Sequence, residues 1–196
     1  MAEVVQTAIG PDARLPKRRT LQERLFVRWP GIYAALSRAV LRLPPRSRLR
    51  RALLRRAVLS GWASWARGDL DLNLVPIAPD CHMDPLPELL AVGMRSSYEG
   101  HAGRRELAAD VREAWERMDT IPQEIVDAGN PFVFLGHIRL RARGSGIEFD
   151  TPFGQVVWIE RGLIVRESGF ADWDEPLRAA GIPTAAVGPP RPATPV

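Results

Sequence analysis

The chain has 196 residues, of which 45% are hydrophobic and 26% are charged, as is usual for a soluble globular protein. No apolar run approaches the roughly 20 residues that a membrane span needs, and no secretory signal is visible near Met1. The single cysteine, Cys81, excludes an intramolecular disulfide and a thiolate metal site of its own. These properties predict one medium-sized domain in the cytoplasm.

The charge is distributed unevenly along the chain. Residues 1–56 carry fourteen Lys or Arg against three acidic residues, a balance of +11. The remaining residues carry thirteen basic and twenty acidic groups, a balance of −7, and the two balances sum to +4. This asymmetry predicts a basic N-terminal arm on an acidic body.

The N-terminal third reads as a disordered start followed by helices. Residues 1–19 show no periodicity and are predicted to be disordered. Thr20 and Glu23 form a capping box that starts a helix, and Pro30 must kink or restart it. A further helix is expected from Ser47 to about Arg67, then a short one ending near residue 76. We therefore predict a basic helical arm over 20–46, a main domain over 47–182 and a flexible Pro-rich tail over 183–196.

The second half switches from helical to strand periodicity. A strand over 80–84 precedes an amphipathic helix in "GRRELAADVREAWERM". Period-two patterns then predict strands at about 122–128, 131–143, 147–160 and 163–171, with a last short helix in "WDEPLRAAGI". Helices followed by a run of antiparallel strands predict an α+β fold, with helices on one face of a curved sheet.

One hairpin can be placed in register from its charges. With Ser145-Gly146 as a two-residue loop, Arg143 pairs with Glu148 and Arg141 with Asp150 on one face. Apolar residues then share the other face. We therefore expect the arginines of this hairpin, Arg139 included, to lie on the outer face of the sheet.

The same elements resemble a known family. "ARGDLDLNL", "DPL", "YEGHAGRREL" and "IERGLIVRESGFADWDEPLRAAGI", in this order, are similar to the SnoaL-like branch of the nuclear transport factor 2-like superfamily over about Ser47–Ile182. This resemblance implies a cone closed by helices, which commonly dimerises through its outer sheet face. The branch includes ketosteroid isomerases, polyketide cyclases, epoxide hydrolases, dehydratases and non-enzymatic binding domains, so the fold does not select the activity.

The resemblance also suggests catalytic residues. The family's general-base aspartate in an Asp-Pro step matches Asp84, and its second aspartate falls near Gln155, whose amide could polarise a carbonyl. Its tyrosine falls near Gly61 or Trp62, where no phenol is present. Because this triad is incomplete, steroid isomerisation itself is excluded.

His82 and Asp84 are two residues apart on a strand and therefore share one face. Burial beside apolar groups would raise the pKa of Asp84 and suit it to proton abstraction, with His82 assisting. The alternative is structural, with Asp84 capping the next turn and His82 bonding a backbone carbonyl.

Aromatic residues supply most of the predicted pocket wall. His101 is either a lid residue at the cone mouth or an ordinary surface histidine, and His137 is assigned to the outer face. The three histidines lack metal-ligand spacing, and no nucleotide- or cofactor-binding motif occurs, so neither a metal nor a cofactor is predicted. The candidate pocket residues are Trp62, Trp65, Tyr98, His101, Trp115, Phe149 and Phe153.

The basic segment allows three interpretations of its role. "RSRLRRALLRR" can be a solvated helix face paired with acidic groups, a surface that lies on anionic lipid, or a phosphate-binding face. No nucleic-acid motif accompanies it, so nucleic acid is the least favoured partner.

Two functions remain open from the sequence. The first is binding of a small, hydrophobic carbonyl compound, with isomerisation, cyclisation or dehydration by proton transfer from the compound to Asp84 as base. The second is a non-catalytic ligand-binding or dimerisation module that the arm docks to a partner or a membrane surface. A deep cavity on which His82 and Asp84 converge would favour the first.

Overall fold

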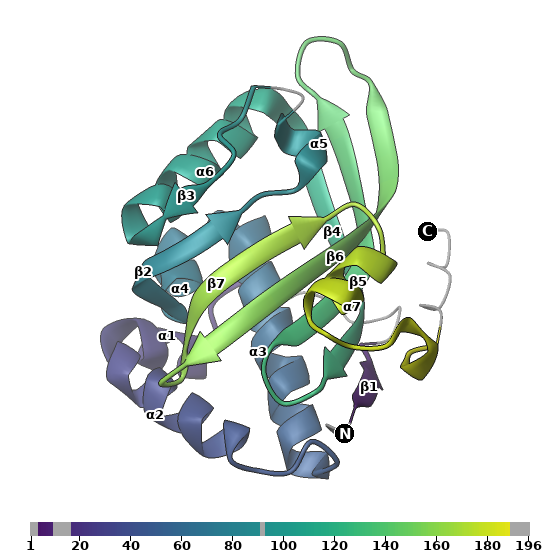
Figure 1. The fold of residues 1–196 in the computed structure, drawn as a ribbon. Coiled ribbons are helices and arrows are strands. Elements are labelled where there is room, and N and C mark those ends of the chain that lie inside the picture. The colour runs from purple at the N-terminus through teal and green to yellow at the C-terminus, as the bar shows by residue number, and fades with distance from the viewer. Residues whose placement is uncertain (1–3, 10–16, 91–92, 189–196) are drawn as a thin grey trace.

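The computed structural model describes residues 4–9, 17–90 and 93–188 and shows an α+β fold, which confirms the predicted class (Figure 1). In chain order the elements are β1 (Val5–Ala8), α1 (Leu21–Arg28), α2 (Pro30–Leu41), α3 (Arg48–Ala66), α4 (Leu70–Leu74), β2 (Ile77–Asp84), α5 (Pro87–Leu90), β3 (Tyr98–Glu99), α6 (Gly100–Ala114), β4 (Trp115–Asp127), β5 (Phe132–Ala142), β6 (Glu148–Glu160), β7 (Leu163–Phe170), α7 (Asp174–Ala179) and a 3-10 helix η1 (Thr184–Ala186).

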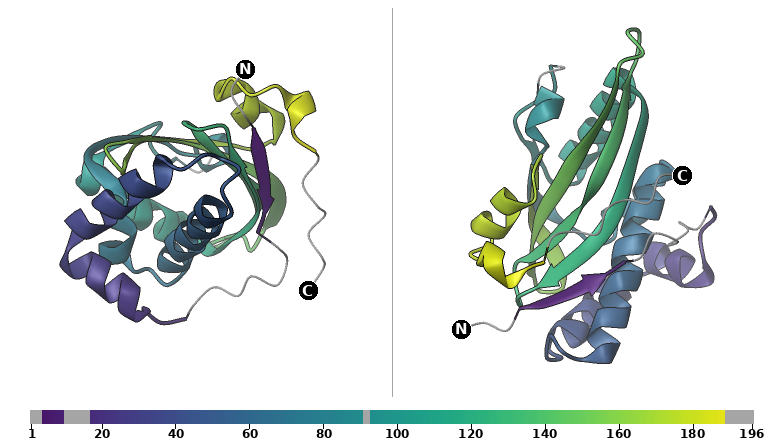
Figure 2. Two further views of the ribbon diagram at one scale, coloured as in Figure 1. Left: turned by 90° about the horizontal axis from the view of Figure 1, so that it is seen from below. Right: turned by 90° about the vertical axis from the view of Figure 1, so that its right-hand side faces the viewer.

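The seven strands form one curved, unclosed sheet in the order β1-β4-β5-β6-β7-β2-β3. Strand β2 runs parallel to β7, and every other neighbouring pair is antiparallel. Helices α3, α4 and α6 lie on one side of the sheet, and α7 lies on the other (Figure 2). The sheet and the first three of these helices enclose the cone that the resemblance predicts.

The core has one part on each face of the sheet. The concave part contains Met83, Leu107, Ile138 and Phe153 and packs against Trp62 and Trp65. The convex part packs α7 and the following turn against the sheet through Val133, Leu135, Val156, Leu177 and Ile182. Part of the outer face is therefore covered by the chain itself, and homodimerisation through that face stays a prediction.

The arm forms as its sequence predicts. The Thr20 hydroxyl accepts from the Glu23 amide, and the Glu23 carboxylate accepts from the Thr20 amide at 2.7 Å, so the capping box is present. Pro30 is the first residue of α2, where a missing N–H has no consequence, so it restarts the helix rather than kinking it. Ser47 caps α3 by accepting from the Arg50 amide.

Several local expectations differ from the structure. Helix α6 ends at Ala114 and β4 begins at Trp115, so the "WERM" end of the predicted helix is the start of a strand, which pairs with β5. Within 1–19, where disorder is expected, Val5–Ala8 pair with β4 as strand β1. The β5–β6 hairpin pairs Arg141 with Glu148 and Arg139 with Asp150, two residues away from the predicted register. The reason is a longer loop, in which Gly144 and Gly146 both adopt positive φ angles and Ala142 bonds Ile147 across it.

None of the helices in the described ranges is both long and apolar enough to cross a membrane.

Candidate functional site

A cavity of about 650 Å³ lies between the concave face of the sheet and helices α1–α4. Its volume falls in the range of ordinary small-molecule sites. The wall is mostly apolar, with Trp62 and Trp65 from α3, Phe134 and Phe153 from the sheet, and Leu107 from α6. Such a wall favours a mainly apolar ligand.

A buried polar network interrupts this apolar wall. Arg104 of α6 donates through Nη1 to Glu167 Oε2 of β7 at 2.8 Å, and through Nε to Asn73 Oδ1 at 2.7 Å. Its guanidinium also lies 4.8 Å from the Trp65 ring centroid. Asn73, Arg104, Glu167 and Trp65 all border the cavity. The site therefore contains a fixed charge pair in apolar surroundings, where electrostatic interactions are strong.

Several polar groups on the cavity wall have no protein partner. Among the described residues, the Gln155 amide, the Tyr33 hydroxyl and Arg104 Nη2 make no hydrogen bond. Burial raises the pKa of Tyr33 to about 12, so its hydroxyl keeps its proton and can donate. These three groups are available as hydrogen-bond donors to an oxygen atom of a ligand.

The arm supplies one wall of the same cavity. Phe26, Tyr33 and Val40 of α1 and α2 line it opposite the sheet. Figure 2, seen from below, shows α1 and α2 arching around α3 at one end of the molecule. The cavity is thus built from two segments that the sequence assigned to separate regions, 20–46 and 47–182.

Both ends of the arm are anchored to the body. At its start, Arg19 pairs with Asp69, and the buried Glu23 accepts from the Ser60 hydroxyl at 2.6 Å. At its end, Arg50 Nη1 donates to the carbonyl oxygens of Leu41 and Leu43, at 2.7 and 2.6 Å. Arg50 also forms a buried ion pair with Asp127 at 2.7 Å. The arginine-rich segment is therefore partly used for internal pairing.

The middle of the arm touches the β6–β7 turn. Gly162 in that turn has a φ of +83°, and a Cβ built there would lie 2.2 Å from the Ala34 carbonyl oxygen of α2. Only glycine allows this approach, so the turn holds α2 against the end of the sheet.

The structure separates the predicted site residues into two groups. Trp62, Trp65, Asp84, Phe153 and Gln155 border the cavity. The others make contacts elsewhere. The Tyr98 hydroxyl donates to Asp110 Oδ2, His101 Nε2 bonds the Ile77 carbonyl, and the rings of Trp115 and Phe149 pack edge to face. His82 does not border the cavity either, so it and Asp84 do not converge there.

His82 and Asp84 instead belong to a polar cluster across β2, β3 and β7. His82 Nε2 lies 2.8 Å from Asp84 Oδ1, and His82 Nδ1 lies 2.5 Å from Glu99 Oε1. Asp84 Oδ2 also accepts from the Ser168 hydroxyl at 2.8 Å and from Arg166 at 3.3 Å. Because side chains alternate along a strand, His82, Arg166 and Ser168 lie on the face opposite Met83 and Glu167, which border the cavity. Asp84, the last residue of β2, both belongs to this cluster and borders the cavity.

These contacts set the protonation of the cluster. Burial pushes the pKa of Asp84 upward, but hydrogen bonds from Ser168 and His82 outweigh burial, so the net pKa is lowered. This is opposite to the sequence-based expectation, which considered burial alone. The hydrogen bond to Glu99 raises the pKa of His82, and contact with Asp84 adds to the rise. Asp84 is accordingly a carboxylate held by several donors, and a weaker base than expected.

Within the described ranges, no three His, Cys, Asp or Glu side chains are grouped so that they could hold a metal ion.

An open cone with a ligand-sized cavity is a known class of fold, and comparison with solved structures identifies this class. An NTF2-like protein of unknown function from Burkholderia pseudomallei matches with 25% identity and a TM-score of 0.54, over 64% of this chain and 95% of that one. TerC, co-crystallised with polyporic acid, matches with 21% identity and a TM-score of 0.54, over 64% and 95%. A ketosteroid isomerase-like protein from Catenulispora acidiphila, in complex with trimethylamine, matches with 16% identity and a TM-score of 0.50, over 68% and 97%.

The chain therefore has the fold of the nuclear transport factor 2-like superfamily, as the resemblance predicted. No protein-family model and no curated protein sequence matches the chain. The likeness is thus one of architecture, and the activity must be argued from the site.

Three cavity residues were not anticipated from the sequence. Arg104 and Glu167 lie within the quoted motifs "YEGHAGRREL" and "IERGLIVRESGF". Each is a charged residue next to predicted core positions, and this pattern could have indicated a buried polar group. Tyr33 lies in the arm, which the resemblance does not cover. Only the fold places it on the cavity wall.

Proposed function

We propose that the protein binds a small, mostly apolar molecule that carries a carbonyl or similar oxygen atom. The supporting observation is the cavity of about 650 Å³, whose apolar wall is interrupted by the unpartnered donors of Gln155, Tyr33 and Arg104. Trp62 and Trp65 provide flat surfaces for an aromatic or polycyclic ligand, and Gln155 polarises its oxygen. Solved neighbours with this fold hold small molecules, polyporic acid in TerC and trimethylamine in the protein from Catenulispora acidiphila.

The chemistry that we propose for this ligand is proton transfer next to its carbonyl group, as in isomerisation, cyclisation or dehydration. Asp84 at the cavity border is the base suggested by the resemblance, and His82 holds it from the outer face through the 2.8 Å contact. Glu167 is a second carboxylate bordering the cavity, and its Oε1 makes no hydrogen bond within the described residues. The two carboxylates can be distinguished by substitution.

A matched pair of ligands tests binding and oxygen recognition together. 9-Fluorenone and fluorene have nearly the same flat shape, but only fluorenone carries a carbonyl oxygen. Both are expected to quench the fluorescence of Trp62 and Trp65, with fluorenone binding about three- to tenfold more tightly, as one or more hydrogen bonds would give. Equal affinities would contradict the recognition of an oxygen atom, and failure of both ligands to bind would contradict an apolar pocket.

A second experiment addresses the reaction. The natural ligand is to be captured by mass spectrometry of small molecules that co-purify with the protein. Turnover of that compound or its carbonyl analogues is then compared between wild type, Asp84→Asn and Glu167→Gln. Because Glu167→Gln also breaks the ion pair with Arg104, turnover is measured on protein that circular dichroism shows to be folded. Loss in Asp84→Asn alone then supports Asp84 as the base, loss in folded Glu167→Gln alone assigns the role to Glu167, and unchanged turnover in both removes carboxylate catalysis.

A further inference from the structure

The outer surface of the arm is unusually apolar. Nine large hydrophobic side chains in the described residues are exposed, and seven of them fall between residues 21 and 53. We call these seven the arm patch: Leu21, Leu25, Trp29, Ile32, Leu36, Leu49 and Leu53. Leu21 is 82% exposed, and Trp29 is 51% exposed. Exposed apolar side chains that gather on helices in contact with one another mark an interaction surface.

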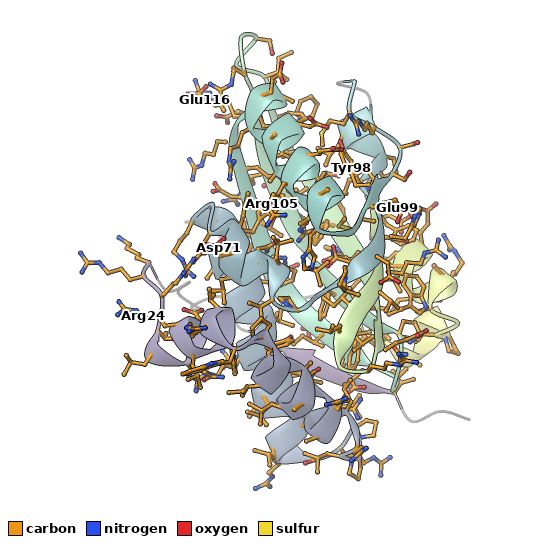
Figure 3. The ribbon with its side chains drawn as sticks, turned by 90° about the vertical axis from the view of Figure 1, so that its left-hand side faces the viewer. Arg24, Asp71, Tyr98, Glu99, Arg105 and Glu116 are labelled. Atoms are coloured by element: carbon orange, nitrogen blue, oxygen red, sulfur yellow. The ribbon has the colours of Figure 1, made fainter. Side chains whose placement is uncertain are left out.

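The segment that carries the arm patch is also rich in exposed cations. Eight exposed Lys or Arg side chains of residues 17–56 make no ion pair or hydrogen bond through their side chains within the described part of the chain: Lys17, Arg18, Arg24, Arg28, Arg38, Arg42, Arg48 and Arg56. The only acidic residue in this range, Glu23, is buried and bonded to Ser60. Arg28 lies 5.6 Å from the ring centroid of Trp29, and Arg24 projects from α1 at the edge of the molecule (Figure 3). The surface is therefore both apolar and strongly positive.

The arm patch is continuous with the cavity. Leu36 and Leu53 belong to the patch, 51% and 36% exposed, and both also border the cavity. Leu36 and Leu53 therefore connect the exposed apolar surface to the cavity wall.

We infer that the arm patch docks the protein onto the surface of an anionic lipid bilayer. Leucine and tryptophan side chains insert at the boundary of headgroups and acyl chains, while arginines reach the phosphate groups, as in interfacial amphipathic helices. Each cation near such a surface adds to the electrostatic attraction.

Other occupants fit this surface less well. A second copy meeting it face to face would bring two sets of unpaired cations together without an acid between them. A nucleic acid would neutralise the arginines but would leave the apolar side chains in contact with charged phosphates. An acidic protein partner is distinguished by the experiment below. The inference does not depend on the proposed function, because it concerns the outside of the arm.

Co-sedimentation of the full chain with vesicles tests the docking. Phosphatidylcholine vesicles containing about a third phosphatidylserine are compared with pure phosphatidylcholine at low and at 0.5 M salt. We expect binding to the anionic vesicles at low salt, and at least a tenfold weaker partition to neutral vesicles or at high salt. Equal binding to both compositions, or binding to neither, would overturn the inference.

Two matched variant pairs assign the binding to the arm patch. Arg24→Glu/Arg28→Glu is expected to reduce partition at least tenfold, whereas Arg105→Glu/Arg178→Glu, the same charge change on α6 and α7, is expected to retain most of it. Leu25→Ser/Trp29→Ser is expected to weaken binding more than Ile147→Ser/Phe149→Ser, which alters the two large exposed hydrophobic residues that lie outside the arm patch in the described part of the chain. Circular dichroism and melting checks that each variant is folded.

Two results would oppose the docking. If the arm variants partition like their controls, the surface is not the arm patch. If the protein binds soluble polyglutamate but no anionic vesicle, the surface takes an acidic polypeptide instead of lipid.

Discussion

Arg104 on α6 and Glu167 on β7 are 63 residues apart in the chain, yet they form an ion pair of 2.8 Å inside the cone. Their side chains are only 13% and 8% exposed. Glu167→Gln would leave the arginine without its counter-charge in a buried site, and we expect a loss of about 3 kcal/mol in the free energy of unfolding. Urea denaturation measures this loss.

The double variant Arg104→Met/Glu167→Leu is the control for this pair. It removes both charges and leaves no unpaired one, so it should lose less stability than the sum of the single changes. Additive losses would show that the two side chains act independently.

Gly162 should hold the arm in place. Gly162→Ala introduces a Cβ in contact with the Ala34 carbonyl, in addition to the strain of a positive φ. Gly146→Ala is the matched control, since its φ is +68° and nothing lies within 4 Å of the added atom. Both changes should cost about 1–2 kcal/mol for the backbone conformation, and Gly162→Ala should cost more and accelerate tryptic cleavage in the arm. Equal effects in the two variants would contradict a close contact between the turn and α2.

The hydroxyl group of Tyr33 should contribute to ligand binding without contributing to folding. Its hydroxyl has no protein partner among the described residues, so Tyr33→Phe should leave the melting temperature unchanged. We expect the affinity for 9-fluorenone to fall about three- to tenfold and that for fluorene to stay the same. Titration of tryptophan fluorescence checks both ligands, and an equal fall for both would indicate altered packing rather than a lost hydrogen bond.

The His82–Asp84 pair should make stability depend on pH. The raised pKa of His82 means that its contribution is complete below its unfolded pKa, about 6.5, and is lost as pH rises through the folded value. The lowered pKa of Asp84 means that its contribution is present above about 3.9 and is lost as pH falls through the folded value. The pair therefore stabilises most between about pH 4 and 6.5.

His82→Gln measures this contribution. It should cost more at pH 5.5 than at pH 8.5, by less than about 1 kcal/mol because His82 is 39% exposed and screened by solvent. Glu99→Gln should lower the pKa of His82 in an NMR titration, since the bond to Glu99 is the largest cause of its rise. A pH-independent effect of His82→Gln would contradict an ion pair.

Features encoded by neighbouring residues were predictable from the sequence. The capping box of Thr20 and Glu23, the restart at Pro30 and the start of α3 after Ser47 depend on backbone groups within one helical turn. The α+β class followed from the change from helical to strand periodicity along the chain, and the cone shape followed from the family resemblance.

The hairpin register was not predictable from charge pairing. Arginines alternate along β5 and acids alternate along β6, so a shift of two residues still pairs Arg141 with an acid on the same face. The loop conformation decides between these registers, and two glycines with positive φ allow the longer loop. The assignment of Arg139 and Arg141 to a face survives because a shift of two preserves the alternation.

The candidate site was predictable only in part. Trp62, Phe153 and Gln155 follow from the periodicity of their elements and from the resemblance. The side of the sheet that His82 occupies depends on the pairing of β2 with β7 across more than 80 residues. The position of Tyr33 on the cavity wall depends on where the arm folds back against the cone.

The contacts of Arg50 determine where the chain can be truncated without loss of stability. Its Nη1 donates to Leu41 and Leu43 of the arm, while Nε and Nη2 hold Asp127 on β4. Cutting the chain before Ser47 would leave these buried N–H groups without acceptors, at about 1–3 kcal/mol for each unsatisfied group. We therefore expect the arm and the cone to unfold as a single cooperative unit, which is larger than the cone shared with the solved structures.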